Sequence, residues 1–294
     1  MRDGSARKLA RGFTRTRQTR PLAMNKVRSL KDAVSPVFSG ASVAIGGMLT
    51  YRRPMILVAE LIRQRASRLA LIGWTLGIET ELLLNRPDVV STIRSAYIGL
   101  DLFGMAPRFR EMVESGRVSV IEETESTMGL GLRAALQNVG FMPARTLLGT
   151  DLMDVRPDIK RVTCPYTGEE YPAIPALRPD VTLIHVPICD TEGNAVIYTN
   201  RGVDRELALL ADYTVVSAEE VVAPDDPRLS DCGIIGRSVN AVVHAPGGAW
   251  PTSCYPAYRM DALALQDYVD AFPDGADQLI EAWLTRLQEG ATIV

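Results

Sequence analysis

The stretch SVAIGGMLTYRRPM, residues 42–55, sets the fold prediction. It begins as an apolar run typical of a buried strand and passes directly into the glycine pair Gly46–Gly47. A short polar turn with Arg52 and Arg53 follows, and a proline then opens an apolar segment with helical spacing. A strand, a glycine turn and a helix start together make one unit of an α/β sheet.

The turn at Gly46 and Gly47 is a candidate ligand site. In open parallel sheets, ligands bind at the carboxyl ends of the strands, where each strand leads into a helix. Glycines there let the backbone approach a ligand closely. Arg52 and Arg53 would supply charge for a carboxylate or a phosphate. The alternative is equally open, since a strand-to-helix corner often needs glycine for its geometry alone. The turn carries neither the GxGxxG fingerprint of dinucleotide sites nor the Lys-Ser/Thr of a phosphate-binding loop.

Strand-like and helix-like segments alternate outward from this stretch. Apolar strand patterns occur at residues 68–74, 89–100, 117–123, 180–189, 213–222 and 240–246. Helical patterns occur at residues 29–38, 54–66, 79–86, 106–116, 126–140 and 275–290. This alternation predicts an α/β fold with an open, mostly parallel sheet covered by helices. Residues 151–180, with five prolines, interrupt it and predict an excursion with a hairpin that turns at Thr167-Gly168.

Composition narrows the class of protein. The chain has 294 residues, of which 47% are hydrophobic and 23% charged, as in an ordinary globular protein. Its four cysteines are far apart in the sequence, which argues against a zinc site and against a disulfide framework. Free cysteines favour a location in the reducing cytoplasm. Only two histidines are present, and no apolar run has the length of a membrane span. We therefore expect no metal, no permanently bound cofactor and no membrane contact.

Residues 1–23 form a basic segment ahead of an acidic body. They hold seven basic residues and one acidic residue, and the rest of the chain has a formal charge of −9. The segment could contact nucleic acid or membrane phosphates, or act as a transit peptide. We favour the interpretation that the sequence begins at an upstream start codon and that the protein itself begins at Met24. A segment with a regular helical and strand pattern begins immediately after Met24. The body, taken as a single domain over residues 24–294, is too acidic to bind nucleic acid.

The stretch VIEETESTMGLG, residues 120–131, brings three carboxylates to a strand-to-helix junction: Glu122, Glu123 and Glu125. Thr124 is a candidate N-cap, which would place Glu125 in the first helical turn, where an acid stabilises the helix dipole. The functional alternative is a carboxylate whose pKa is raised by its like-charged neighbours, suited to work as a base or a nucleophile.

Two further stretches contain polar side chains in apolar surroundings. His185 lies on an apolar strand, where a single histidine is more often a hydrogen-bonded core residue than a catalyst. Asn194 follows in the turn DTEGNA and could point its side chain at a ligand. His244 begins a loop rich in glycine, proline and aromatic residues, which fits either a pocket lining or a rigid crossover.

Several motifs in order resemble the family I coenzyme A transferases, specifically the α (A) subunit of the glutaconate CoA-transferase type. They are SLKDAV, SGASVAIGGMLTYRRP, FREMVESGRVSV, GFMPAR, IPALRPDVTLIHVPICDTEGNA, YTVVSAEEVV and NAVVHAPGGAWPTSCY. The resemblance runs from about Lys26 to the end of the chain. Met48 replaces the phenylalanine that usually follows the glycine pair.

The resemblance implies an open α/β sheet of the CoA-transferase type and an enzyme assembled from α and β subunits. The nucleophilic glutamate is expected in the β subunit, so this chain alone would be inactive. Gly46, Gly47 and Met48 are expected to line the acyl-CoA site, with Arg52, Arg53 and Asn194 as further substrate- or CoA-binding candidates. The CoA thioester would be the substrate, and the assembly a heterodimer or a dimer of heterodimers.

The α subunits of steroid ring-cleaving CoA-thioester hydrolases resemble the same family and carry an acid in the EETES region. This implies an alternative in which Glu125, or its neighbour Glu123 or Glu122, is a base that opens a cyclic β-diketone CoA thioester. A third hypothesis is a non-catalytic ligand-sensing module whose basic arm touches nucleic acid. For the β subunit, we expect contact through residues 151–180 and through the aromatic loop 247–258, unless its aromatic residues pack within the chain.

Overall fold

The computed structural model describes residues 25–289. The basic segment 1–23, and with it the nucleic-acid, membrane and transit-peptide interpretations, lies outside the described residues. None of the helices within residues 25–289 combines the length and apolar character that a bilayer crossing requires.

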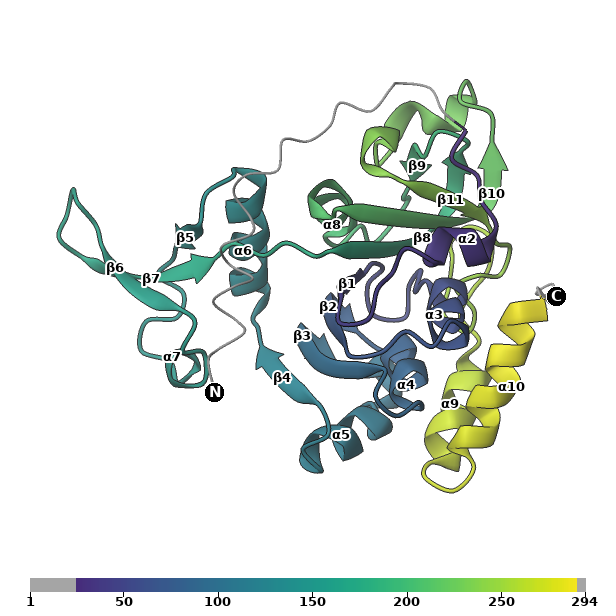
Figure 1. Cartoon of the computed structure of the whole chain (residues 1–294), viewed down its shortest axis with the longest axis horizontal. Coiled ribbons are helices and arrows are strands. Elements are labelled where there is room, and N and C mark those ends of the chain that lie inside the picture. Colours follow the sequence, from purple (N-terminus) through teal and green to yellow (C-terminus); the bar gives the residue numbers. More distant parts are fainter. Residues whose placement is uncertain (1–24, 290–294) are drawn as a thin grey trace.

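A central sheet of eight strands confirms the predicted α/β class (Figure 1). Seven strands are parallel in the order β11-β10-β8-β1-β2-β3-β4, and the short β9 pairs antiparallel with β8. Their bounds are β1 Ser42–Ile45, β2 Leu69–Leu76, β3 Val90–Ile98, β4 Ser119–Glu122, β8 Val181–Asp190, β9 Ala195–Val196, β10 Tyr213–Val222 and β11 Ala241–His244. All ten residues of β8 are buried, which explains its continuous apolar run.

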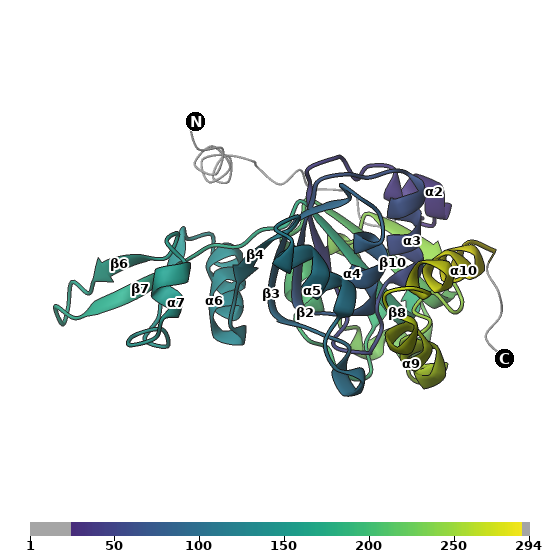
Figure 2. The same cartoon turned by 90° about the horizontal axis from the view of Figure 1, so that it is seen from below.

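Helices cover both faces of this sheet (Figures 1 and 2). One face packs against α2 Leu30–Val34, α3 Met55–Arg63, α4 Ile78–Leu84, α5 Pro107–Glu114, α9 Ala262–Ala271 and α10 Ala276–Glu289. The other face packs against α6 Glu125–Leu136 and α8 Asp204–Leu210. Residues 25–289 also contain three short 3₁₀ turns: η1 Asp101–Phe103, η2 Pro227–Asp231 and η3 Gly236–Ser238. The predicted helix at residues 54–66 is α3, but Pro54 is its N-cap and not its first helical residue.

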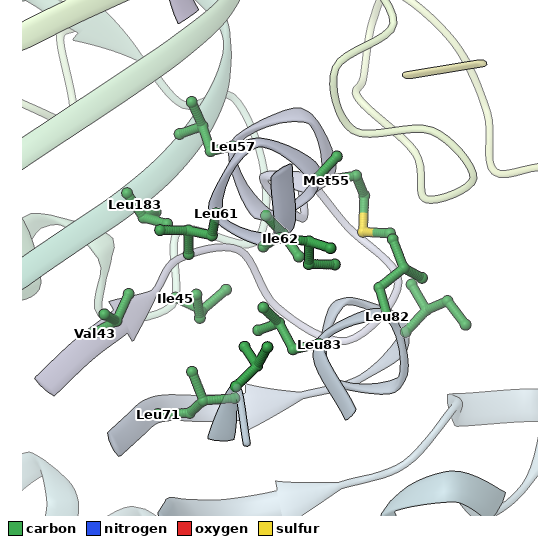
Figure 3. Packing of buried hydrophobic residues seen from close by; sticks show 14 of the residues in the cluster. Val43, Ile45, Met55, Leu57, Leu61, Ile62, Leu71, Leu82, Leu83 and Leu183 are labelled. Carbon is green, nitrogen blue, oxygen red and sulfur yellow. The ribbon is translucent and has the colours of Figure 1, made fainter. Parts of the chain in front are cut away.

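Strand β1 shows how the two faces are filled. Val43 and Ile45 point into the larger cluster, and Ala44 points into the cluster beneath α6 and α8. Figure 3 shows Val43 and Ile45 beside side chains of α3 and α4, among them Leu61 and Leu83. Burying each such side chain stabilises the fold by about 2 kcal/mol. The glycine turn that follows β1 therefore starts from a rigidly packed strand.

The Pro-rich excursion, together with the preceding residues 141–143, folds as a small antiparallel sheet of its own. It has the order β5-β7-β6, with bounds β5 Phe141–Pro143, β6 Lys160–Thr163 and β7 Glu170–Pro175, and carries α7 Leu152–Val155. The predicted hairpin is confirmed, because β6 and β7 pair antiparallel around a turn in which Gly168 has a φ of +74°. Figures 1 and 2 show this arm projecting from the main sheet beyond α6.

Glu81 joins three of the helices on the larger face. Its carboxylate accepts hydrogen bonds from the backbone N–H groups of Arg108 and Phe109 at the start of α5, each at 2.8 Å. It also accepts one from the Tyr268 hydroxyl on α9, at 2.7 Å. Burial raises the pKa of the Glu81 carboxyl to about 7, although these donors oppose the shift.

Because the pKa of Glu81 is higher in the folded than in the unfolded chain, its protonation stabilises the fold below an unfolded value near 4.5. That contribution, about 3 kcal/mol at most, is lost as the pH rises towards 7. Glu81→Gln should therefore lower the free energy of unfolding more at pH 5 than at pH 7.5, measured by urea denaturation. The control is Glu114→Gln, an exposed carboxylate on α5. Equal losses at both pH values for Glu81→Gln would contradict this prediction.

Candidate active site

The glycine turn lies where β1 ends, at the carboxyl edge of the sheet. The Gly46 N–H donates to the Leu183 carbonyl oxygen at 2.8 Å, and the Gly47 N–H donates to Asp204 Oδ1 at 2.9 Å. Gly47 has a φ of +82°, and a Cβ atom there would lie 2.5 Å from the Tyr51 carbonyl oxygen. Glycine is therefore required by the turn's own geometry, whatever ligand the turn meets.

Arg52 is enclosed and ion-paired within the chain. Its guanidinium contacts Asp204 Oδ2 at 2.8 Å and the Asn200 carbonyl oxygen at 2.6 Å. Of the Arg52 nitrogen atoms, Nε has no acceptor among the described residues. The sequence predicted that this guanidinium binds a ligand; in this structure it pairs with Asp204, and the ligand-binding role stays a prediction. Burying an arginine is tolerated here because Asp204, the first residue of α8, balances its charge.

Arg53 is fully buried and holds the same turn from inside. It donates to the carbonyl oxygens of Leu49 at 2.8 Å and Gly46 at 3.2 Å, and to both oxygens of Thr75 at 2.7 Å. Its Nε lies 3.4 Å from a carboxylate oxygen of Glu79. Burial lowers the pKa of Arg53, and Glu79 opposes the shift. Arg53, too, makes its contacts within the chain, and its ligand-binding role stays a prediction.

The acidic junction has one buried carboxylate, Glu123, and two exposed ones, Glu122 and Glu125. Thr124 caps α6 as predicted, accepting from the Thr127 N–H at 3.0 Å. Glu123 is buried between Arg94, at 2.6 Å, and Arg156, at 3.1 Å. Sequence patterns gave no signal for this pairing because both arginines come from distant segments. The ion pairs give Glu123 a structural role.

Glu125 stands in the first turn of α6, as predicted, and is exposed. Its Oε1 accepts a hydrogen bond from the Trp74 indole N–H at 3.0 Å. Trp74 is near the end of β2, and the next residue, Thr75, accepts from the Leu49 N–H of the glycine turn at 2.8 Å. The end of β2 thus connects Glu125 and the glycine turn at one edge of the sheet, which makes this edge the candidate active site.

The Asn194 side chain makes hydrogen bonds within the chain that stabilise the turn in which it lies. Its Nδ2 donates to Asp190 Oδ2 at 2.6 Å, and its Oδ1 accepts from the Gly236 N–H at 2.8 Å. Both ends of the amide are therefore used within the chain. The amide links the end of β8 to η3, and a ligand contact of Asn194 stays a prediction.

A buried polar cluster lies beside the turn. His185 is a hydrogen-bonded core residue, as expected, with Nδ1 2.9 Å from Ser217 Oγ and Nε2 2.6 Å from Glu219 Oε1. The Glu219 carboxylate also accepts from the Tyr258 hydroxyl at 2.6 Å. Burial would raise the pKa of Glu219, but its bonds with His185 and Tyr258 hold it below the ordinary value. Glu219 was missed from the sequence, although strand alternation places it on the same face as Ser217.

Within residues 25–289, His185, Glu219 and Cys254 are the one group spaced to hold a metal ion, with donor atoms within 4.8 Å of one another. Both ring nitrogens of His185 and both carboxylate oxygens of Glu219 already make hydrogen bonds. Burial also raises the pKa of the Cys254 thiol, which opposes the thiolate that a metal needs. The arrangement fits a hydrogen-bonded network better than a metal centre.

A glycine turn and an exposed glutamate at the carboxyl edge of an open parallel sheet define an α/β protein with its ligand site at that edge. Residues 27–245 match the model of the family described as coenzyme A transferase. The chain therefore belongs to the coenzyme A transferase family, which confirms the resemblance seen in its motifs.

The relatives cover nearly the whole chain. The A subunit of glutaconate CoA-transferase from Acidaminococcus fermentans is 30% identical over 90% of both chains. A crystal structure of glutaconate coenzyme A-transferase from that organism has a TM-score of 0.80 at 28% identity, over 89% of this chain and 88% of that one. The cholesterol ring-cleaving hydrolase IpdA subunit of Rhodococcus jostii is 31% identical over 87% of this chain and 91% of its own. The decarboxylase AibA/AibB matches with a TM-score of 0.82 and 31% identity, over 90% of this chain and all of that one.

Proposed function

We propose that this chain is the α subunit of a heteromeric CoA-transferase that moves CoA between an acyl-CoA and a carboxylic acid. The observation that carries this proposal is its similarity, over nine-tenths of both chains, to a protein named as the A subunit of such an enzyme. The ligand site is then the sheet edge at Gly46, Gly47 and Met48. The substrate is a CoA thioester, with no permanently bound cofactor, and the complex works in the cytoplasm.

The chemistry needs a nucleophile from the β subunit. A glutamate carboxylate there attacks the thioester carbonyl carbon, and CoA leaves as a thiolate while an acyl-glutamyl anhydride forms. The CoA thiolate then attacks the glutamyl carbonyl carbon and releases the first acid, and the acceptor acid reverses both steps. This chain contributes one wall of the pocket. Its turn is held in place by Asp204 and Arg53, so the wall is rigid before substrate arrives.

The β subunit is expected to contact the projecting arm and the exposed part of loop 247–258. Tyr166, at the tip of the arm, is 95% exposed and Tyr255 is 59% exposed. The other two aromatic residues of loop 247–258, Trp250 and Tyr258, pack within the chain. Trp250 lies against Trp283 and beneath the Arg286 guanidinium, and Tyr258 bonds Glu219, so neither belongs to the predicted interface. The assembly remains a heterodimer or a dimer of heterodimers.

A second candidate function is the hydrolase, with Glu125 as a base that opens a cyclic β-diketone CoA thioester. It is favoured by one observation: Glu125 is exposed at the candidate edge and accepts from Trp74, whereas Glu123 is ion-paired with Arg94 and Arg156. Glu122 is also exposed and stays the alternative base. A base in this chain would act directly on substrate or water and would need no anhydride.

The test is to co-express this protein and its β subunit, then incubate the complex with a panel of acyl-CoA thioesters and acetate. For the transferase, acyl exchange should persist in Glu125→Gln within about threefold of wild type, since Glu125 then only stabilises the helix start. For the hydrolase, a ring-opened product that keeps its CoA should form, and Glu125→Gln should reduce its rate roughly 100- to 10,000-fold.

The matched control is Glu114→Gln, an exposed carboxylate on α5 that lies outside the acidic junction. Its rate should equal that of wild type under both candidate functions. Release of carbon dioxide without exchange or ring opening would contradict both.

A further inference from the structure

The carboxylate of Glu219, on β10, accepts three hydrogen bonds. The His185 ring and the Tyr258 hydroxyl each lie 2.6 Å from Oε1, and the Gly247 N–H lies 2.6 Å from Oε2. Only 10% of the Glu219 side chain is exposed. A buried carboxylate with three donors is ionised and strongly held, so it fixes the segments from which those donors come.

Two of the donors are the two ends of loop 247–258. Gly247 is its first residue and Tyr258 its last, and both bond Glu219. The Tyr258 oxygen also accepts from the Ala249 N–H at 3.0 Å. Tyr258 further pairs with Cys254 through both backbone groups, at 3.0 and 3.1 Å. The conformation of the whole loop therefore depends on this one carboxylate.

The middle of the same loop binds the segment that follows the glycine pair. The Ser253 carbonyl oxygen accepts from the Arg52 N–H at 2.7 Å, and the Ser253 N–H donates to the Thr50 carbonyl oxygen at 2.9 Å. The hydroxyl of Thr252 accepts from the Arg53 N–H at 3.2 Å. The Ser253 hydroxyl also donates to the Thr50 carbonyl oxygen at 3.2 Å, so four hydrogen bonds join the loop to residues 50–53, which close the glycine turn.

We propose that Glu219 is a positioning residue for the acyl-CoA site, acting on the glycine turn through loop 247–258. The inference rests on the proposed function for its kinetic consequence, but its structural part can be measured without substrate. His185 provides a second connection between Glu219 and the glycine turn. Its ring bonds Glu219, and its carbonyl oxygen accepts from Arg52 Nη1 at 3.3 Å.

The test compares Glu219→Gln with wild type in the complex with the β subunit. An amide in place of the carboxylate turns an N–H towards one of the three donors and frees at least one end of the loop. Hydrogen exchange of the backbone N–H groups at residues 50–53 should become roughly tenfold faster, and that of β2 and β3 should stay unchanged. The kcat for acyl transfer should fall roughly 10- to 100-fold with little change in KM, because the turn is displaced but not removed.

The matched control is Glu220→Gln. Glu220 is the neighbouring residue, but its exposed side chain pairs with Arg228. Exchange at residues 50–53 and kcat should both remain at wild-type values. If Glu219→Gln does not fold, Tyr258→Phe removes one of the three donors and should shift exchange and kcat in the same direction by a smaller amount.

Faster exchange in loop 247–258 without any change at residues 50–53 would overturn the inference, as would an unchanged kcat. The failure of the proposed function would look different. A wild-type complex without acyl-transfer activity, whose residues 50–53 still exchange faster in Glu219→Gln, would contradict the CoA-transferase assignment and leave the coupling through the loop intact.

Discussion

Gly47→Ala is expected to abolish acyl-CoA chemistry and to destabilise the fold by about 3 kcal/mol or more. The new Cβ atom would lie 2.5 Å from the Tyr51 carbonyl oxygen and 2.7 Å from that of Arg52. Both are backbone atoms, so the turn itself must move, and the φ of +82° adds strain for any L side chain. Urea denaturation and the acyl-exchange rate of the complex measure the two effects.

Gly40→Ala separates the clash from the backbone strain. Gly40 has a φ of +83°, almost that of Gly47, but a Cβ atom there would meet no atom within 4 Å. This variant should cost about 1 kcal/mol, the strain alone, and leave activity at the wild-type level. A Gly47→Ala variant no less stable than Gly40→Ala, with acyl exchange retained, would contradict the crowding argument.

The sheet and its helices could be predicted from the sequence because their signals are local. Ser29 and Thr124 are N-caps, as expected, and the hairpin turns at Gly168. Each of these features depends on residues within a few positions of one another, where spacing and turn chemistry suffice. The apolar run at β8 likewise reports burial on both faces, which the structure shows.

The side-chain partners at the site could not be predicted in the same way. Arg52 pairs with Asp204 and Arg53 with Glu79, across sequence separations that no periodicity encodes. From the sequence, an arginine beside a glycine turn looks the same whether it faces a ligand or a buried carboxylate. The partner of the Asn194 carbonyl oxygen was missed for the same reason, since its donor is Gly236 in η3, 42 positions away.

Replacing Arg53, which pairs with Glu79, is expected to reduce the stability of the fold strongly. Both side chains are completely buried. Glu79 Oε1 accepts from the Gly77 N–H at 2.8 Å, whereas its Oε2 has no hydrogen-bond partner among the described residues and depends on the charge of Arg53. Arg53→Met would leave an uncompensated carboxylate in the core and remove the donor to the carbonyl oxygens of Gly46, Gly47, Leu49 and Thr75. The free energy of unfolding should fall by about 3 to 5 kcal/mol.

Adding Glu79→Gln should recover part of that loss, because the buried negative charge is removed together with the positive one. A double-mutant cycle measured by urea denaturation should give a coupling free energy of about 2 kcal/mol between the two residues. The surface control is Arg110→Met, which breaks the exposed pair with Glu114 on α5 and should cost less than about 0.5 kcal/mol. If Arg53→Met costs no more than Arg110→Met, the buried pair does not hold the glycine turn.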